Sequence, residues 1–151
     1  MTAVLQRIKH ATVYADGVLS GDVGEGLYIL LGVESGDDAE DATLLAEKIS
    51  KLRIFEDDAG KMNRSVQDID GEVMVVSNFT LAADYSHGNR PSYLGAAAPG
   101  VAESLYDSFV QLMSAHVKKV ATGRFGADMR TDMQTDGPVT IVMHSSVLRK
   151  K

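Results

Sequence analysis

The spacing of hydrophobic residues in the first half of the chain predicts strands. Residues 2–15 and 18–23 are rich in Val, Leu, Ile, Thr and Tyr, and Asp16-Gly17 between them suits the tight turn of a β-hairpin. Residues 27–33 and 73–76 are continuous apolar runs, a pattern typical of strands that are covered on both faces. We therefore expect these two runs at the centre of a sheet.

A helical period follows the first apolar run. Residues 37–52 carry apolar side chains on one helical face, and Asp37 with Glu40 three residues later resembles a capping box. A second helix is predicted from Pro99 to about His116, with the proline in its first turn. The two apolar stripes consist of Ala42, Leu45, Ala46, Ile49 and Leu52, and of Ala102, Leu105, Tyr106, Phe109 and Met113.

Shorter patterns complete the expected fold. Residues 53–56 and 61–62 predict a small hairpin around Asp58-Ala59-Gly60, and residues 139–143 alternate as a last strand that Asp136-Gly137-Pro138 introduces. Strands outnumber helices, and hairpin signals outnumber crossover signals. The expected fold class is therefore α+β: a single compact domain with a mainly antiparallel, curved, barrel-like sheet and two packed helices.

The composition is that of a soluble globular protein. The chain has 151 residues, of which 44% are hydrophobic and 24% are charged, so we expect one domain over residues 1–151. It has no cysteine, which excludes a disulfide framework, a thiolate zinc site and a cysteine nucleophile. No apolar stretch suits a secretory signal or a membrane span. We expect a cytoplasmic protein without a membrane partner.

The net charge and the spacing of histidines and glycines exclude several classes of function. The net charge of −6 argues against a protein that holds nucleic acid along a long track, although a brief, local encounter with RNA is compatible with it. The four histidines are scattered without metal-ligand spacing, and the glycines match no nucleotide-binding loop. We expect neither a metal nor a cofactor.

Two polar segments have both a structural and a functional interpretation. Ser77-Asn78-Phe79-Thr80-Leu81 follows a buried strand and places hydroxyls, an amide and free backbone N–H groups at its end, which fits a capped sheet edge or a reactive site. Asp136-Gly137-Pro138-Val139-Thr140 fits an ordinary turn before the last strand. Only about 5–6% of X-Pro bonds in folded proteins are cis, so the residues alone do not predict a cis bond here.

Seven short motifs, in order along nearly the whole chain, resemble the D-aminoacyl-tRNA deacylase family. After an opening Ala3-Val4-Leu5-Gln6-Arg7, these motifs are Leu30-Leu31-Gly32-Val33, Leu52-Arg53-Ile54-Phe55, Gly60-Lys61-Met62-Asn63, Ser77-Asn78-Phe79-Thr80-Leu81, Arg90-Pro91-Ser92-Tyr93, Thr122-Gly123-Arg124-Phe125-Gly126-Ala127-Asp128-Met129 and Gly137-Pro138-Val139-Thr140. Two positions depart from the family pattern: Asn78 replaces the usual Gln, and Thr135 replaces an Asn.

The resemblance implies a compact homodimer with active sites at the interface, each completed by a Gly-cis-Pro dipeptide from the partner subunit. In this sequence the dipeptide is Gly137-Pro138. Its backbone carbonyls would face the substrate's α-carbon and leave no space for an L side chain, so chirality would be judged by exclusion. Glycine would pass such a filter, which adds glycyl-tRNA as an expected substrate.

The implied chemistry is hydrolysis of the ester between a D-amino acid and the terminal adenosine of tRNA. The RNA 2′-hydroxyl would assist the attack, and Ser77, Asn78, Phe79 and Thr80 would orient the ester and supply backbone donors. Thr80 is the alternative nucleophile, although no general base is evident near it. The resemblance places the residues that contact the substrate at Arg7, Met129, Gly137, Pro138 and Thr140.

Two rival functions stay open. One is a hydrolase of free D-amino acid esters or peptides that needs no RNA, and the other is a non-catalytic RNA-binding or replication-associated module. Comparing the hydrolysis of aminoacyl-tRNA with that of a minimal amino-acid ester separates the first rival from a tRNA deacylase. The second predicts RNA binding without release of amino acid.

Overall fold

The computed structural model describes residues 1–150, which form a curved sheet with two long helices packed on one of its faces. The elements, in chain order, are β1 (Thr2–Ala15), β2 (Val18–Val23), β3 (Gly26–Gly32), α1 (Ala39–Lys51), β4 (Phe55–Glu56), β5 (Met62–Arg64), β6 (Glu72–Ser77), the 3₁₀ helix η1 (Phe79–Ala82), α2 (Pro99–Ser114), β7 (Lys119–Thr122), β8 (Met129–His144) and α3 (Ser145–Leu148). The α+β class expected from the sequence is confirmed.

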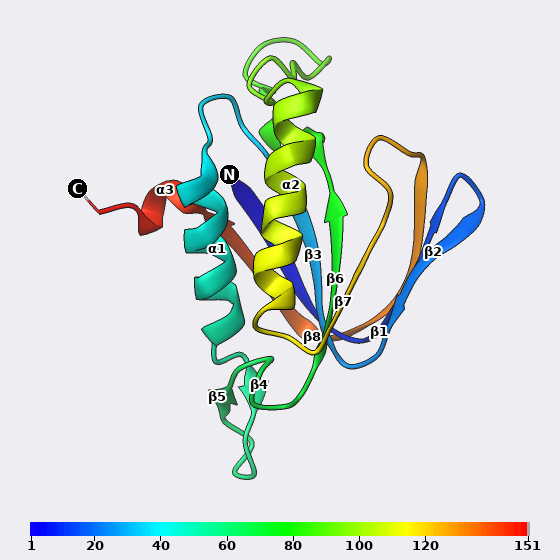
Figure 1. Cartoon of the computed structure of the whole chain (residues 1–151), viewed down its shortest axis with the longest axis vertical. Helices are drawn as coiled ribbons and strands as arrows, with labels where there is room; N and C mark the ends of the chain where they lie inside the picture. The colour runs from blue at the N-terminus through cyan, green and yellow to red at the C-terminus, as the bar shows by residue number, and fades with distance from the viewer. Residues whose placement is uncertain (151) are drawn as a thin grey trace.

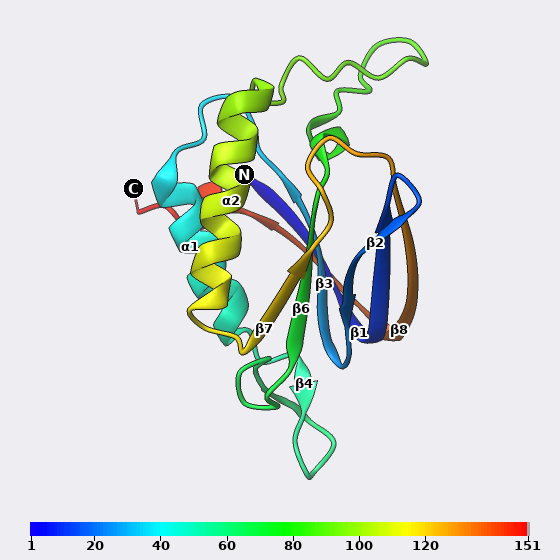
Figure 2. The same cartoon turned by 45° about the vertical axis from the view of Figure 1, so that its right-hand side comes forward.

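The large sheet is mixed and nearly closes on itself. Its order is β2-β1-β3-β6-β7, with β8 on β1 as well, and three of its five strand pairings are antiparallel while β6 pairs in parallel with both β3 and β7. The Ser20 hydroxyl donates to the Thr122 carbonyl at 2.8 Å, which ties β2 to β7. Figure 2 shows the resulting curl, and it confirms the barrel-like sheet.

Two hydrophobic cores lie on opposite faces of the central strands. The helices α1 and α2 lie side by side over one face (Figure 1), and the core beneath them includes Ile29, Val75, Leu45 and Phe109. The core inside the curl is formed by Ile8, Ala11, Val13, Val23, Tyr28, Met74 and Val76. Because β3 and β6 are covered on both faces, both central strands are continuous apolar runs.

The N-terminus of α1 differs from the expected capping box by one residue. Asp38 is the N-cap, and the Asp41 carboxylate accepts from the Asp38 backbone N–H at 2.8 Å. The Asp37 carboxylate instead accepts from the backbone N–H of Glu34 at 2.6 Å. The expected Asp37–Glu40 pair is therefore wrong, because Asp37 is already used by the preceding turn.

The last strand is longer than expected. It begins at Met129 rather than after Pro138, and the expected turn at Asp136-Gly137-Pro138 is an interruption within it. Its first half alternates half-buried and exposed residues, but only Met129 and Met133 are apolar there, so the alternation gives a weak sequence signal. The sequence patterns also gave no indication of the strand β7 or the helix α3. In residues 1–150, no helix is long and apolar enough to cross a membrane.

Candidate active site

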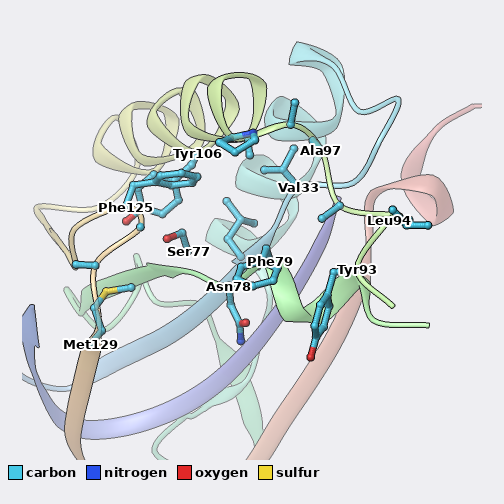
Figure 3. A pocket seen from close by; sticks show the side chains of 17 residues that line it. Val33, Ser77, Asn78, Phe79, Tyr93, Leu94, Ala97, Tyr106, Phe125 and Met129 are labelled. Carbon is cyan, nitrogen blue, oxygen red and sulfur yellow. The ribbon is translucent and has the colours of Figure 1, made fainter. Parts of the chain in front are cut away.

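An apolar cavity of about 660 Å³ opens where β6 ends. It lies between the start of α2, η1 and the segments that precede α2 and β8 (Figure 3). Its walls are formed by Leu31, Val33, Ser77, Asn78, Phe79, Tyr93, Leu94, Ala96, Ala97, Ala98, Pro99, Ala102, Tyr106, Phe125, Gly126, Ala127 and Met129. Four of the predicted site residues, Ser77, Asn78, Phe79 and Met129, therefore line one cavity.

Asn78 fixes the turn from β6 into η1. Its backbone N–H donates to the Leu31 carbonyl at 2.8 Å, which continues the pairing of β6 with β3 for one more residue. Its side-chain oxygen accepts from the Thr80 backbone N–H at 3.2 Å and from the Thr80 hydroxyl. Asn is a favoured N-cap residue because its short side chain reaches such groups. In Figure 3 the Asn78 amide points away from Tyr106 and Phe125.

Phe79 and Thr80 lie at the mouth of the cavity. Thr80 is exposed and does not line it, and its hydroxyl donates to Asn78 rather than to a base. Phe79 is 60% exposed and meets the Tyr93 ring edge-on, with the ring centroids 5.2 Å apart. The mouth is thus an aromatic rim with polar backbone beside it.

The inner wall of the cavity is aromatic. The Tyr106 hydroxyl donates to the Val75 carbonyl at 2.8 Å, and burial raises the pKa of Tyr106 above its ordinary value of 10.0, so this phenol stays neutral. The Phe125 ring lies 6.1 Å from that of Tyr106, centroid to centroid. The sequence places Tyr106 in a helix stripe and gives no site role to Phe125 or Tyr93. The motifs at 90–93 and 122–129 are the signals that could have found them.

Met129 enters the cavity because Gly123 leaves room for it. A Cβ on Gly123 would lie 2.2 Å from the Met129 sulfur. Gly123 itself is held by its N–H, which donates to the Val75 carbonyl at 3.3 Å. This local packing explains why a glycine stands just after the end of β7.

Gly137 and Pro138 lie in a wide bulge of β8. Between the paired positions Gln6–Thr140 and Ile8–Thr135, β8 has the four residues 136–139 where β1 has only Arg7. The Gly137-Pro138 peptide bond is cis, as the resemblance implies, and both residues are exposed.

Arg7 fixes the position of this bulge. It is 8% exposed, and its Nε donates to the Asp136 carbonyl at 2.9 Å while Nη1 donates to the Ile54 carbonyl at 2.8 Å. The Asp136 carboxylate is 3.3 Å from Nε. A buried guanidinium with acceptors on two segments holds both segments in place.

Within one chain, the bulge and the cavity lie apart. Arg7, which contacts the bulge, pairs with Leu27 near the start of β3, whereas Leu31 at the other end of β3 lines the cavity. Four residues of strand span about 13 Å. Thr140 is exposed and does not line the cavity either. The structure therefore does not bring Arg7, Gly137, Pro138 and Thr140 to the cavity of their own chain.

The chemistry of the cavity follows from its lining. It offers an apolar, aromatic space with a few hydroxyl, amide and backbone groups at its edge, which is typical of sites for small organic groups. Among residues 1–150, no group of three or more His, Asp or Glu side chains is arranged to hold a metal ion.

The chain is similar to known proteins along nearly its whole length, and these proteins define its class. The chain superposes on a solved structure of a c-Myc DNA Unwinding Element Binding Protein with a TM-score of 0.89 and 36% identity, covering 95% of this chain and 98% of the other. It is 52% identical to the D-aminoacyl-tRNA deacylase of Ruegeria pomeroyi, over 95% of this chain and 99% of that protein. It is 53% identical to the D-aminoacyl-tRNA deacylase of Delftia acidovorans, over 93% and 94% of the two chains.

The family assignment follows from the sequence profile. Residues 4–144 match the D-Tyr-tRNA(Tyr) deacylase family, and this range covers nearly all of the described chain. The protein belongs to this family.

Proposed function

We propose that this chain hydrolyses the ester bond that joins a D-amino acid to the terminal adenosine of tRNA, releasing the D-amino acid and the tRNA. The observation that carries the proposal is the likeness to D-aminoacyl-tRNA deacylases along nearly the whole chain, at 52% and 53% identity. The substrate and the enzyme would meet in the cytoplasm, where aminoacyl-tRNA is used.

The segment Ser77–Thr80 is the proposed catalytic segment. The first N–H groups of a helix have no partner inside the helix, so the Phe79 N–H at the start of η1 is available to stabilise a developing oxyanion. The Thr80 N–H is already bonded to the Asn78 side chain, which would have to share it. Ser77, at the cavity wall, supplies a hydroxyl that orients the ester.

The attack on the ester is assisted by the 2′-hydroxyl of the RNA. Two features support this proposal over a Thr80 nucleophile. The Thr80 hydroxyl donates its hydrogen to the Asn78 amide oxygen, which is too weak a base to activate it, and no histidine lines the cavity within the described chain. Water is then the nucleophile: its oxygen forms a bond to the ester carbonyl carbon, and the bond from that carbon to the 3′-oxygen of the adenosine breaks. One proton of the water passes to the 3′-oxygen, and the amino acid leaves with the water oxygen in its carboxyl group.

A second copy of the chain completes each site. The bulge with Gly137 and Pro138 is remote from its own cavity, yet it is exposed and held in place by Arg7. Around the cavity mouth, the exposed side chains of large hydrophobic residues form a rim that a partner could cover. These residues are Phe79 at 60%, Tyr93 at 39% and Leu94 at 92% exposure.

The inserted dipeptide acts as the chiral filter. The carbonyl groups of Gly137 and Pro138 from the second copy face the α-carbon and admit hydrogen on that side, so an L side chain is rejected by steric exclusion. Met129 of the chain that forms the cavity and Thr140 of the second copy contact the substrate beside the dipeptide. Glycyl-tRNA has no side chain to reject, and it is the second substrate that this filter would admit.

Matched D- and L-aminoacyl-tRNA test the proposal directly. We expect release of the D-amino acid and survival of the L-ester, measured as loss of labelled aminoacyl-tRNA over time. Equal hydrolysis of both enantiomers would reject the filter. A D-aminoacyl-tRNA that ends in 2′-deoxyadenosine should resist hydrolysis, and its normal turnover would remove the role of the 2′-hydroxyl.

The two rival functions make different predictions. A hydrolase of free esters would cleave a D-amino acid methyl ester as well as the tRNA substrate. A nucleic-acid-binding module, suggested by the name of the solved relative, would bind without releasing any amino acid. The net charge of −6 disfavours that module, because tight binding of nucleic acid normally uses a basic surface.

A further inference from the structure

We propose that the β4–β5 hairpin and the last turn of α1 bind the phosphate backbone of the RNA whose aminoacyl end occupies the partner subunit's cavity. This surface, the hairpin surface, consists of Lys48, Lys51, Arg53, Lys61 and Met62. The inference rests on the proposed function, because it names the part of the same substrate that this surface contacts.

Unpaired positive charge is concentrated on this surface. Of the fourteen Lys and Arg residues in 1–150, seven lie within 4.0 Å of a carboxylate oxygen of the described chain and seven do not. The seven without such a partner are Lys48, Lys51, Arg53, Lys61, Arg90, Arg130 and Lys150. Four of the seven fall within the stretch 48–61, and all four are exposed. In a chain of net charge −6, this concentration favours an anionic partner.

Hydrogen bonds within the hairpin occupy the carboxylate of one of its acidic residues, Asp57. The Asp57 carboxylate accepts from the backbone N–H groups of Ala59 and Lys61, at 2.9 and 3.0 Å, and from the Asn63 amide at 2.8 Å. Arg53 donates to the Asn63 carbonyl at 3.1 Å and to its side-chain oxygen at 2.6 Å. Because Asp57 is occupied by the turn, the charges of Lys61 and Arg53 are not neutralised by a direct contact with it.

The remaining carboxylates of the segment leave it basic. Asp58 pairs with Arg64 at 3.1 Å, and Glu56 is exposed with no cation within 4.0 Å in the described chain. Residues 48–64 hold five cations and three carboxylates, whereas the whole chain holds 15 and 21. The RNA phosphates would meet a surface of locally opposite charge, which suits contacts that position the substrate without reading its bases.

The hairpin surface is joined to the bulge that would complete the partner's site. Arg7 donates to the Ile54 carbonyl, next to β4, and to the Asp136 carbonyl, next to Gly137. Figure 1 shows the hairpin projecting from the end of the molecule at which β1 and β8 bend. If the bulge enters the partner's cavity, the hairpin of the same chain lies beside the RNA that leads out of that cavity.

Charge reversal with two substrates tests the inference. We expect K61E and K51E each to raise KM for D-aminoacyl-tRNA about tenfold and to reduce the salt slope of tRNA binding by about one, while kcat/KM for D-aminoacyl-adenosine, which has no phosphate, stays unchanged. The matched control is K150E, which reverses an exposed lysine that also lacks a carboxylate partner in the described chain and lies outside the hairpin surface.

Binding of deacylated tRNA, which carries no amino acid, separates this inference from the proposed function. It is measured by fluorescence anisotropy at two salt concentrations. If the native protein cleaves neither substrate but K61E and K51E weaken tRNA binding, the surface stands and the proposed function fails. If the native protein is active and the two variants bind tRNA like K150E, the inference is overturned. An equal loss on D-aminoacyl-tRNA and D-aminoacyl-adenosine would also overturn it.

Discussion

Asn78 joins the sheet to the candidate site through both its backbone and its side chain. The backbone N–H extends the pairing with β3, and the amide oxygen caps η1 and accepts the Thr80 hydroxyl. A glutamine at this position would carry its amide one methylene further from the backbone. The oxygen would then reach beyond Thr80, while the main-chain N–H groups of η1 would keep their places.

Asn78→Gln is therefore expected to change kcat/KM for a D-aminoacyl-tRNA by less than about tenfold, or roughly 1.4 kcal/mol. The reason is that the proposed oxyanion donor is a main-chain group that does not depend on the length of this side chain. Steady-state kinetics on one D-aminoacyl-tRNA measure the ratio. A change approaching a thousandfold would mean that the Asn amide itself sets the transition-state geometry.

Thr80→Ala is expected to keep activity within about tenfold of the native protein, since one neutral hydrogen bond contributes only about 1 kcal/mol. The hydroxyl donates to Asn78, and nothing in the described chain positions a base to deprotonate it. Single-turnover kinetics give the rate, and mass spectrometry after rapid quenching detects any acyl group on the protein. An acyl intermediate on Thr80 would restore covalent catalysis.

At the scale of elements, one arginine fastens the C-terminal segment to the start of α1. Arg149 donates from Nε and Nη2 to the two oxygens of Asp41, at 3.0 and 2.9 Å, and from Nη1 to Glu40 at 2.9 Å. The hydrogen bonds from Arg149 hold the pKa of Asp41 well below its ordinary 3.8. Asp41 is 4% exposed, so these contacts are shielded from solvent better than a surface ion pair.

Asp41→Asn should lower the free energy of unfolding by about 1–2 kcal/mol at pH 7. The folded-state pKa lies below the unfolded value, so the charge of Asp41 stabilises the fold above about pH 4, and this contribution is lost as the pH falls toward the folded-state pKa. The deficit of the variant should therefore shrink below about pH 4. Urea unfolding across this range measures it, with Asp107→Asn, at an exposed carboxylate on α2, as control. A deficit that stays constant as the pH falls from neutral into the acid range would contradict the assignment.

The elements differ in how far the sequence predicts them. The runs at 27–33 and 73–76 indicate central strands, because burial on both faces demands apolar residues at every position. The parallel pairing of β6 has no comparable signal, since it depends on where α1 and α2 return the chain. The strand β7 is only four residues long and mostly half-buried, so its sequence shows neither the alternation of a strand nor the repeat of a helix.

For the whole molecule, the site is predictable only in parts. Ser77–Thr80 begins at the last residue of a buried strand, and a polar segment at a strand end is compatible with a site. Tyr93 and Phe125 come from segments far apart in the chain, and only the folded structure brings them to one cavity. The association of Gly137-Pro138 with a substrate comes from resemblance, because its own chain keeps the dipeptide away from the cavity.

Subunit mixing tests whether the bulge of one chain serves the cavity of another. Gly137→Ala should disable the bulge, because its Cβ would lie 2.1 Å from the Val139 nitrogen, and Ala97→Trp should fill the cavity. Each variant alone should be inactive. A dimer with one chain of each type keeps one intact site, so equal mixing and reassociation should restore roughly a quarter of native activity.

The mixing experiment has two internal checks. Sedimentation of each variant must show a native-like dimer, so that loss of activity is not loss of assembly. Mixed dimers that form without any recovery of activity would show that bulge and cavity act within one chain, and a fully active monomer would remove the dimer from the proposal.

The long strand β8 sets a fixed spacing between a cavity-lining residue and the bulge that contains Gly137-Pro138. Met129 at its start lines the cavity of its own chain, and Gly137-Pro138 lies further along the same strand. Because side chains alternate along a strand, an insertion of one residue between Arg130 and Gln134 would turn Met129 or the bulge to the opposite face. Lineages of this protein should therefore tolerate substitutions in that stretch far better than insertions or deletions.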